Sequence, residues 1–335
     1  MPNERAAIIG CGSMGTAHAR GYQEAGCSVV ALVDPNAERR TELGNAVGAK
    51  RLYEDPAQLF GEGDVDIVSI CTWPTTHCDL TVAAAASGVR GILCEKPLAV
   101  TLDEADRMLE ACVQNSVTLA TGHQHRYDAQ AVQAREWIEA GRIGDPVYFW
   151  GHCSLDLMNN GTHVLDLIHY FNGDAPAEWV MAQTDVRSRF RGRMNHPDMP
   201  AEDASITEIR YANGLRACIE MGEFAPSAYQ FHLYGTEGQI DVNPPGGPAA
   251  RLLSSSVLGW EAPELPKVNA TTKKVVEFVN AVRTGREAAC SGTIGRQLLE
   301  VIIGAFESSR SRALVEMPVN VKDFPLEDLF GEPQG

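Results

Sequence analysis

The sequence has no long hydrophobic run and no excess of positive charge. None of its apolar stretches reaches the roughly 18 residues that a membrane-spanning helix needs, and its start is not the basic and then apolar leader of a signal peptide. The formal net charge is −16, which disfavours nucleic acid and anionic membranes as partners. We therefore expect a cytoplasmic protein with no nucleic acid and no membrane among its partners.

The cysteines lack any pairing pattern. There are nine of them, an odd number, and none forms a C-x-x-C motif, which argues against a disulfide framework and against a structural zinc site. Most lie in apolar strand-like segments, where a free thiol behaves as a small hydrophobe. Internal repeats and low-complexity linkers are absent as well, and 335 residues are enough for two domains.

What the sequence does contain is a glycine-rich motif at the end of its first apolar run. Residues 6–9 lead into Gly10-Cys11-Gly12-Ser13-Met14-Gly15, and a second apolar run ends at Asp34, 19 residues after the motif. This is the pattern of a dinucleotide-binding βαβ unit. The first glycine permits a tight turn, the second lets a pyrophosphate approach the backbone, and the third permits close helix packing. An acid placed like Asp34 binds the adenosine ribose hydroxyls, so we expect NAD rather than NADP.

Residues 1–121 alternate between strand-like and helix-like segments, which predicts a parallel sheet with helices on both faces. A ligand of such a sheet lies beyond the carboxyl ends of its strands. The expected strands are 5–9, 28–33, 66–71, 90–94 and 117–120, and the expected helices are 14–25, 36–46, 56–60, 76–87 and 102–114.

Residues 122–335 have a different character and predict an α+β domain with a large, mostly antiparallel open sheet. The segment 243–248 is expected to be a loop. Strands are expected at 146–153, 178–187, 204–211, 214–223 and 229–235, and helices at 130–141, 162–172, 271–284 and 293–310. The fold class is thus an α/β Rossmann domain followed by this α+β domain.

Two residues are candidates for acid–base chemistry. Lys96 follows a predicted strand in Glu95-Lys96-Pro97, where it can transfer a proton; the alternative is a pair with Glu95 on a surface turn. His163 falls on the apolar stripe of the helix 162–172. It is either a catalytic imidazole or a buried histidine bonded to Asp166 one turn further on.

Two further clusters of polar residues each have more than one interpretation. His123 and His125 have the spacing of two metal ligands on a strand, but no third ligand is evident and a polar substrate wall is the better interpretation, so we expect no metal. Arginines alternate at 187, 189, 191 and 193, which suggests a subunit contact or a solvated edge rather than a grip on an anionic substrate.

Taken together, the motifs resemble the Gfo/Idh/MocA family, the group of glucose–fructose oxidoreductase and inositol dehydrogenase, over nearly the whole chain. The resemblance implies a nicotinamide-dependent oxidoreductase that acts on a secondary alcohol or ketone of a sugar, sugar derivative or cyclitol. It also implies a homodimer or homotetramer formed through the C-terminal sheet. The motifs are the glycine-rich turn, Thr72-Trp73-Pro74-Thr75-Thr76-His77, Glu95-Lys96-Pro97, residues 122–127, 141–144 and 161–167, Tyr234-Gly235-Thr236-Glu237-Gly238, and the segment 278–285.

The family signature pairs the Lys of E-K-P with D-x-x-x-H. Lys96 and His163 match it, but Asn159 stands where the family has an acid. A neutral amide can orient an imidazole without stabilising its cation, so Lys96 gains importance as the proton-transfer group. The implied cofactor contacts are Gly10, Gly12, Ser13, Met14, Gly15, Asp34, Thr72, Pro74, His77, Glu95 and Lys96, and the implied substrate contacts are Arg126, Gln124, His152 and Tyr229.

The resemblance leaves two alternatives open. One is a cofactor-binding sensor without catalysis, and the other is a redox-neutral, glycoside-processing enzyme with bound NAD. The identity of the substrate and the direction of the reaction are not encoded in these motifs.

Overall fold

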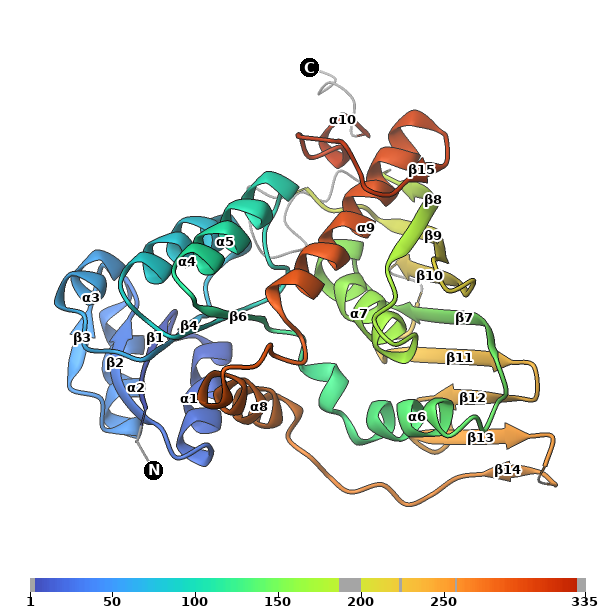
Figure 1. The fold of residues 1–335 in the computed structure, drawn as a ribbon, viewed down its shortest axis with the longest axis horizontal. Helices are drawn as coiled ribbons and strands as arrows, with labels where there is room; N and C mark the ends of the chain where they lie inside the picture. The colour runs from blue at the N-terminus through green and yellow to red at the C-terminus, as the bar shows by residue number, and fades with distance from the viewer. Residues whose placement is uncertain (1–3, 187–199, 223–224, 257, 330–335) are drawn as a thin grey trace. The chain divides into compact units, whose positions relative to one another are not determined.

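The structure, a computed structural model, describes residues 4–186, 200–222, 225–256 and 258–329. The chain forms two compact units, whose elements are labelled in Figure 1. The first contains Met1–Gln124 and Asn269–Arg296, and the second contains His125–Val268 and Gln297–Gly335. We expected a single division after residue 121; instead, a late segment of the chain returns to the first unit.

The first unit is built on a parallel sheet with the strand order β3-β2-β1-β4-β5-β6 in the described chain, which confirms the predicted Rossmann class. Figure 1 shows α4 and α5 on one side of this sheet and α1 and α8 on the other. The strands are β1 (Arg5–Ile9), β2 (Ser28–Val33), β3 (Arg51–Tyr53), β4 (Ile67–Ile70), β5 (Gly91–Cys94) and β6 (Thr118–Thr121). The helices are α1 (Ser13–Glu24), α2 (Ala37–Val47), α3 (Pro56–Glu62), η1 (Pro74–Thr76), α4 (His77–Ala86), α5 (Leu102–Gln114) and α8 (Ala270–Thr284).

Helix α8 completes the core of the first unit although it comes late in the sequence. Its apolar side, which includes Val275 and Phe278, belongs to the same buried cluster as Tyr22 of α1 and Ile8 of β1. A Cβ atom on Gly21 would lie 2.6 Å from the Cβ of Val275, so glycine at this position allows α1 and α8 to pack closely. The return of α8 is therefore a consequence of apolar burial.

The second unit is built on a larger sheet with the order β14-β13-β12-β11-β7-β10-β9-β8-β15 among the described residues. Only β7 and β10 pair in parallel among the described pairs, which confirms a mostly antiparallel sheet. The strands are β7 (Pro146–Cys153), β8 (Ala177–Asp185), β9 (Ala204–Tyr211), β10 (Arg216–Gly222), β11 (Gln230–Gly235), β12 (Gly238–Val242), β13 (Ala250–Ser254), β14 (Trp260–Glu261) and β15 (Val315–Glu316). The remaining elements of the chain are η2 (Gln124–Tyr127), α6 (Ala129–Glu139), η3 (Leu157–Gly161), α7 (Thr162–Phe171), α9 (Gly292–Ser311) and α10 (Leu326–Leu329).

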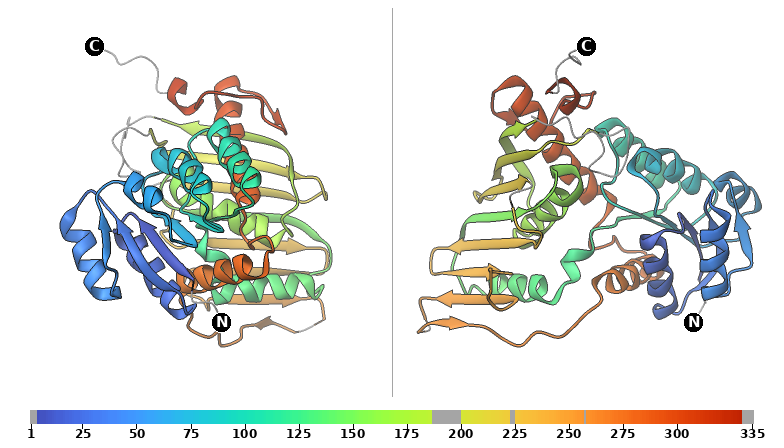
Figure 2. Two further views of the ribbon diagram at one scale, coloured as in Figure 1. Left: turned by 60° about the vertical axis from the view of Figure 1, so that its left-hand side comes forward. Right: turned by 180° about the vertical axis from the view of Figure 1, so that it is seen from behind.

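One face of the second sheet is covered by helices. A Cβ atom on Gly151 of β7 would contact Val164 of α7, so the odd-numbered residues of β7 face α7. Side chains alternate along a strand, and Tyr148, Trp150 and His152 therefore lie on the other face. In Figure 2 this second face carries no helix of the described chain.

Across the described ranges, no helix has the length and apolar character to cross a membrane. The alternating arginines at 187–193 lie outside the described residues.

Candidate functional site

The glycine-rich turn has the geometry that a dinucleotide requires. Gly10 has φ +94°, and a Cβ there would lie 2.5 Å from the Cys71 carbonyl oxygen, whereas a Cβ on Gly15 would collide with the Gly10 carbonyl. At Gly12, no described atom lies within 4 Å of the Cβ position. Helix α1 starts at Ser13 without a side-chain cap, so its first N–H groups, including that of Met14, can bind phosphate.

Asp34 is fixed at the end of β2. Its Oδ2 accepts from the Cys11 N–H at 2.7 Å and its Oδ1 accepts from the Asn36 N–H at 2.8 Å. The Arg40 guanidinium donates to the Asp34 carbonyl oxygen at 2.8 Å. A carboxylate held beside the glycine turn is a suitable acceptor for ribose hydroxyls, so the residues of this turn fit NAD.

His77 connects two of the loops that follow the strands. Its Nδ1 lies 3.0 Å from the Pro97 carbonyl oxygen and its Nε2 lies 3.2 Å from the Thr72 carbonyl oxygen. Burial lowers the pKa of His77, so the ring is neutral near pH 7. Pro74 opens the short helix η1 between Thr72 and His77 and is buried. The neutral ring has one N–H and donates to one of these carbonyls, and it lies between the loop around Thr72 and the segment after Lys96.

Glu95, the residue before Lys96, is the centre of a buried polar network. Its Oε1 accepts from Lys274 Nζ of α8 at 2.7 Å and from His18 Nε2 of α1 at 2.9 Å. Burial alone would raise the pKa of Glu95, but the Lys274 charge and the His18 bond outweigh it and hold that pKa well below its usual range. Lys274 also donates to the Gly122 carbonyl at 3.2 Å.

The protonation state of His18 follows from this network. Burial, reinforced by the Lys274 charge, lowers the pKa of His18 to about 4. The neutral ring donates from Nε2 to Glu95, and its Nδ1 lies 2.9 Å from the Ser69 hydroxyl, where it can accept. Sequence reasoning missed both His18 and Lys274; the signal was a lysine on the apolar side of the helix 271–284.

In the second unit, two aromatic rings from different segments lie against His163. The His125 ring lies edge-on to it, with 4.7 Å between centroids, and the Tyr229 ring lies 5.6 Å away. The Tyr229 and His125 centroids are 4.5 Å apart. His163 is buried at the start of α7. The structure therefore brings the predicted residues His163 and Tyr229 together.

Asn159 lies in η3, which runs directly into α7. The segment from Asn159 to His163 is thus helical, and residues four apart lie on one face. Two buried carboxyls hold the start of η3: Asp156 Oδ1 accepts from the Asn159 N–H at 2.8 Å, and Glu202 Oε1 accepts from the Leu157 N–H at 2.6 Å. Burial and the nearby Asp156 raise the pKa of Glu202 to about 8.

Arg126 is buried in an ion-pair cluster. Its Nε donates to Asp166 at 2.7 Å, its Nη2 lies 2.8 Å from Asp174, and its guanidinium stacks over Tyr170 at 5.3 Å. These contacts link η2 to α7, so Arg126 has a structural role. They also pair Arg126 with Asp166, the residue that the sequence suggests as a partner for His163. A substrate contact of Arg126 stays a prediction.

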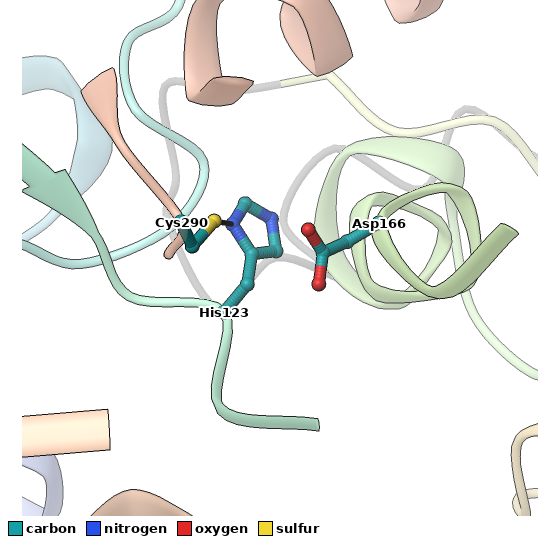
Figure 3. Close-up of side chains that lie close together, drawn as sticks. All are labelled: His123, Asp166 and Cys290. Carbon is teal, nitrogen blue, oxygen red and sulfur yellow. Dashed lines mark hydrogen bonds between the residues drawn. The ribbon is translucent and has the colours of Figure 1, made fainter. Parts of the chain in front are cut away.

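Other predicted residues lie elsewhere. His152 is on the helix-free face of the second sheet, with Nε2 2.7 Å from Gln230 Oε1, which separates it from the His163 cluster. Gln124 begins η2 at the end of the first unit. His123 lies beside the Cys290 thiol, with 3.7 Å between Sγ and Nδ1 (Figure 3).

Comparisons with known proteins identify both parts of the chain. The family model described as "Oxidoreductase family, NAD-binding Rossmann fold" matches residues 4–123, and the GFO/IDH/MocA C-terminal domain model matches residues 155–241. A D-apiose dehydrogenase from Paraburkholderia graminis is 24% identical over 93% of this chain and 89% of its own length. The scyllo-inositol 2-dehydrogenase (NAD(+)) of Bacillus subtilis is 25% identical over 94% of this chain and 96% of its own.

Solved structures share the fold. Levoglucosan dehydrogenase in complex with NADH and levoglucosan has a TM-score of 0.85 and 23% sequence identity, and the match covers 95% of this chain and 100% of that one. The two matching family models and the two sheets agree with the motifs of the sequence. The chain therefore belongs to the Gfo/Idh/MocA family of NAD-binding oxidoreductases.

Proposed function

We propose that this protein is an NAD-dependent dehydrogenase or reductase that acts on a secondary alcohol, or the matching ketone, of a sugar, sugar derivative or cyclitol. The observation that carries the proposal is the glycine-rich turn, where Asp34 and the uncapped start of α1 offer a ribose acceptor and phosphate donors. The apiose and inositol dehydrogenases among its relatives support a polyhydroxylated substrate.

The roles of the residues follow from the chemistry. When bound, NAD supplies a hydride acceptor for the alcohol carbon. Lys96 takes the hydroxyl proton, and His163 hydrogen-bonds the same oxygen. Asn159 orients His163 from the preceding helical turn. His77 and Glu95 hold the loops that carry Thr72 and Lys96. The cofactor is bound by Gly10, Gly12, Ser13, Met14, Gly15, Asp34, Thr72 and Pro74.

NAD is preferred over NADP in this proposal because a fixed carboxylate at Asp34 repels a 2′-phosphate. Arg39 and Arg40 on the following helix are the groups that could instead attract one, but Arg40 already donates to the Asp34 and Pro35 carbonyls. Measuring the affinity for both nucleotides by calorimetry tests this preference.

The test of activity is the change in reduced-nicotinamide absorbance with a panel of inositols, aldoses and amino sugars. Turnover of any of them supports the dehydrogenase. NAD binding without turnover would favour a sensor, and product release from a glycoside without net absorbance change would favour the redox-neutral alternative.

The helix-free face of the second sheet supports association into a homodimer or homotetramer. Met181 and Ile206 are 48% and 54% exposed on this face, and such apolar exposure is typical of interfaces. A Met181→Asp/Ile206→Asp variant should have a lower mass in light scattering.

The free thiols in the structure agree with a reducing compartment such as the cytoplasm.

A further inference from the structure

The carboxylate of Asp128 does not cap the helix that it precedes. Asp128 is the N-cap residue of α6, but the described helix receives no hydrogen bond from its side chain. Asp55, the N-cap of α3, accepts from the Ala57 N–H at 2.8 Å as expected of a cap. The Asp128 Oδ2 instead lies 2.6 Å from His125 Nδ1.

His125 joins this carboxylate to the His163 cluster. Its ring contacts both His163 and Tyr229, at centroid distances of 4.7 and 4.5 Å. His125, Asp128 and Tyr229 also border a cavity of about 280 Å³ within the second unit. This volume is near the lower end of small-molecule sites, roughly 300 Å³.

The hydrogen bond fixes the chemistry of the imidazole. Since Asp128 accepts from Nδ1–H, the neutral His125 ring has its basic lone pair on Nε2. A carboxylate at hydrogen-bond distance also compensates the charge of an imidazolium. Asn159, four residues before His163, is a neutral amide and supplies no such compensation.

We propose that His125 is a further proton-transfer residue of this site and that Asp128 is the carboxylate that positions it. The proposal rests on the proposed function. In alcohol oxidation, the hydroxyl O–H bond would break as Lys96 takes its proton, and the hydride would leave the carbon with two electrons for bound NAD. Water would then carry the proton from Lys96 to His125 Nε2, which restores the neutral amine. Asp128 balances the imidazolium, which returns its proton to water. Reduction of a ketone runs the same steps in reverse.

The titratable groups with contacts to His125 include Asp128, His163 and Tyr229. Burial raises the pKa of Tyr229 well above its usual range, so its phenol is neutral, and it donates to Asn160 Oδ1 at 3.2 Å. Replacing the Asp128 carboxylate therefore removes a negative charge at hydrogen-bond distance from His125.

The activity test compares His125→Gln and Asp128→Asn with the matched control Asp55→Asn, which makes the same change at another N-cap. We expect kcat to fall about 10²-fold in His125→Gln and about tenfold in Asp128→Asn, with little change in KM. Asp128→Glu should recover part of the loss, and both loss variants should alter the acid limb of the pH–rate profile. Asp55→Asn should stay within about twofold of wild type.

A second measurement needs no substrate. Nitrogen-15 NMR of the full chain with labelled histidine should show His125 as the Nδ1–H tautomer, and Asp128→Asn should turn it into a mixture. A wild-type Nε2–H tautomer, or an unchanged kcat in folded His125→Gln, overturns the proposal. If wild type turns over no sugar or cyclitol, the proposed function fails and proton transfer by His125 fails with it, whereas the spectrum separately decides the His125–Asp128 pairing.

Discussion

Lys274 and Glu95, 179 residues apart in the chain, form a buried ion pair with 2.7 Å between Nζ and Oε1. The pair fastens α8 to the residue that precedes Lys96. Because His18 binds the same carboxylate oxygen, Glu95 is held from two helices. The position of the proposed proton-transfer lysine therefore depends on a helix far away in the sequence.

We expect Lys274→Met to lower the free energy of unfolding by about 3–5 kcal/mol, because it leaves the Glu95 charge buried without its cation. Urea unfolding of the first unit measures this change. Lys273→Met is the matched control, since Lys273 is the exposed neighbour on the same helix, and it should change little. Equal stability of the two variants would contradict the role of the ion pair.

The buried histidines predict a loss of stability in mild acid. Burial lowers the pKa of His18 to about 4, and that of His169 to about 4 as well. Between the unfolded value near 6.5 and about 4, the unfolded chain binds protons that the folded chain does not. Stability is therefore full above about pH 6.5 and falls toward pH 4. Urea unfolding at several pH values should show this slope, and His18→Gln should reduce it.

Asp34→Ala should abolish the preference for NAD, since the variant lacks both the ribose acceptor and the charge that repels a 2′-phosphate. Calorimetric titration with NAD and NADP measures the two affinities. Comparable affinities in the wild type would already refute the assignment of Asp34 as the selecting group.

Lys96→Met should reduce turnover by about 10²–10⁴-fold, the usual contribution of a positioned acid–base group. NAD affinity should stay within a few-fold, because the glycine turn and Asp34 are unchanged. Activity close to that of wild type would remove Lys96 from the mechanism.

Asn159→Asp should shift the pH–rate profile upward, because a carboxylate one helical turn from His163 stabilises its imidazolium. His163→Ala should cost less in the chemical step than Lys96→Ala. Single-turnover kinetics measures that step, and a larger loss in His163→Ala would show that Lys96 is not the principal proton-transfer group.

Much of the first unit could be predicted because its signals are local. Continuous apolar runs gave the strands β1, β2, β4, β5 and β6, and the glycine spacing predicted the cofactor turn. The loop at 243–248 was predicted from its prolines and glycines and lies between β12 and β13. The flanking strands were missed, because strands of five residues with mixed polarity carry little periodic signal.

Tertiary contacts account for the rest. His169 is only 2% exposed, because α7 is buried on almost all sides. Likewise, no local pattern shows that Lys274 reaches Glu95, or that Asp128 bonds an imidazole instead of capping its helix. These partners are set by long-range packing, which overrides the local pattern.

The return of α8 also has a consequence during synthesis on the ribosome. At about 5–20 residues per second, synthesis over the 179 positions from Glu95 to Lys274 takes roughly 10–40 seconds. Throughout that interval the nascent Rossmann sheet lacks the helix that covers α1, and the Glu95 carboxylate lacks its cation. Every strand of the second sheet except β15 is translated before α8, so chaperones that bind exposed apolar surface have a defined window in which to act on this chain.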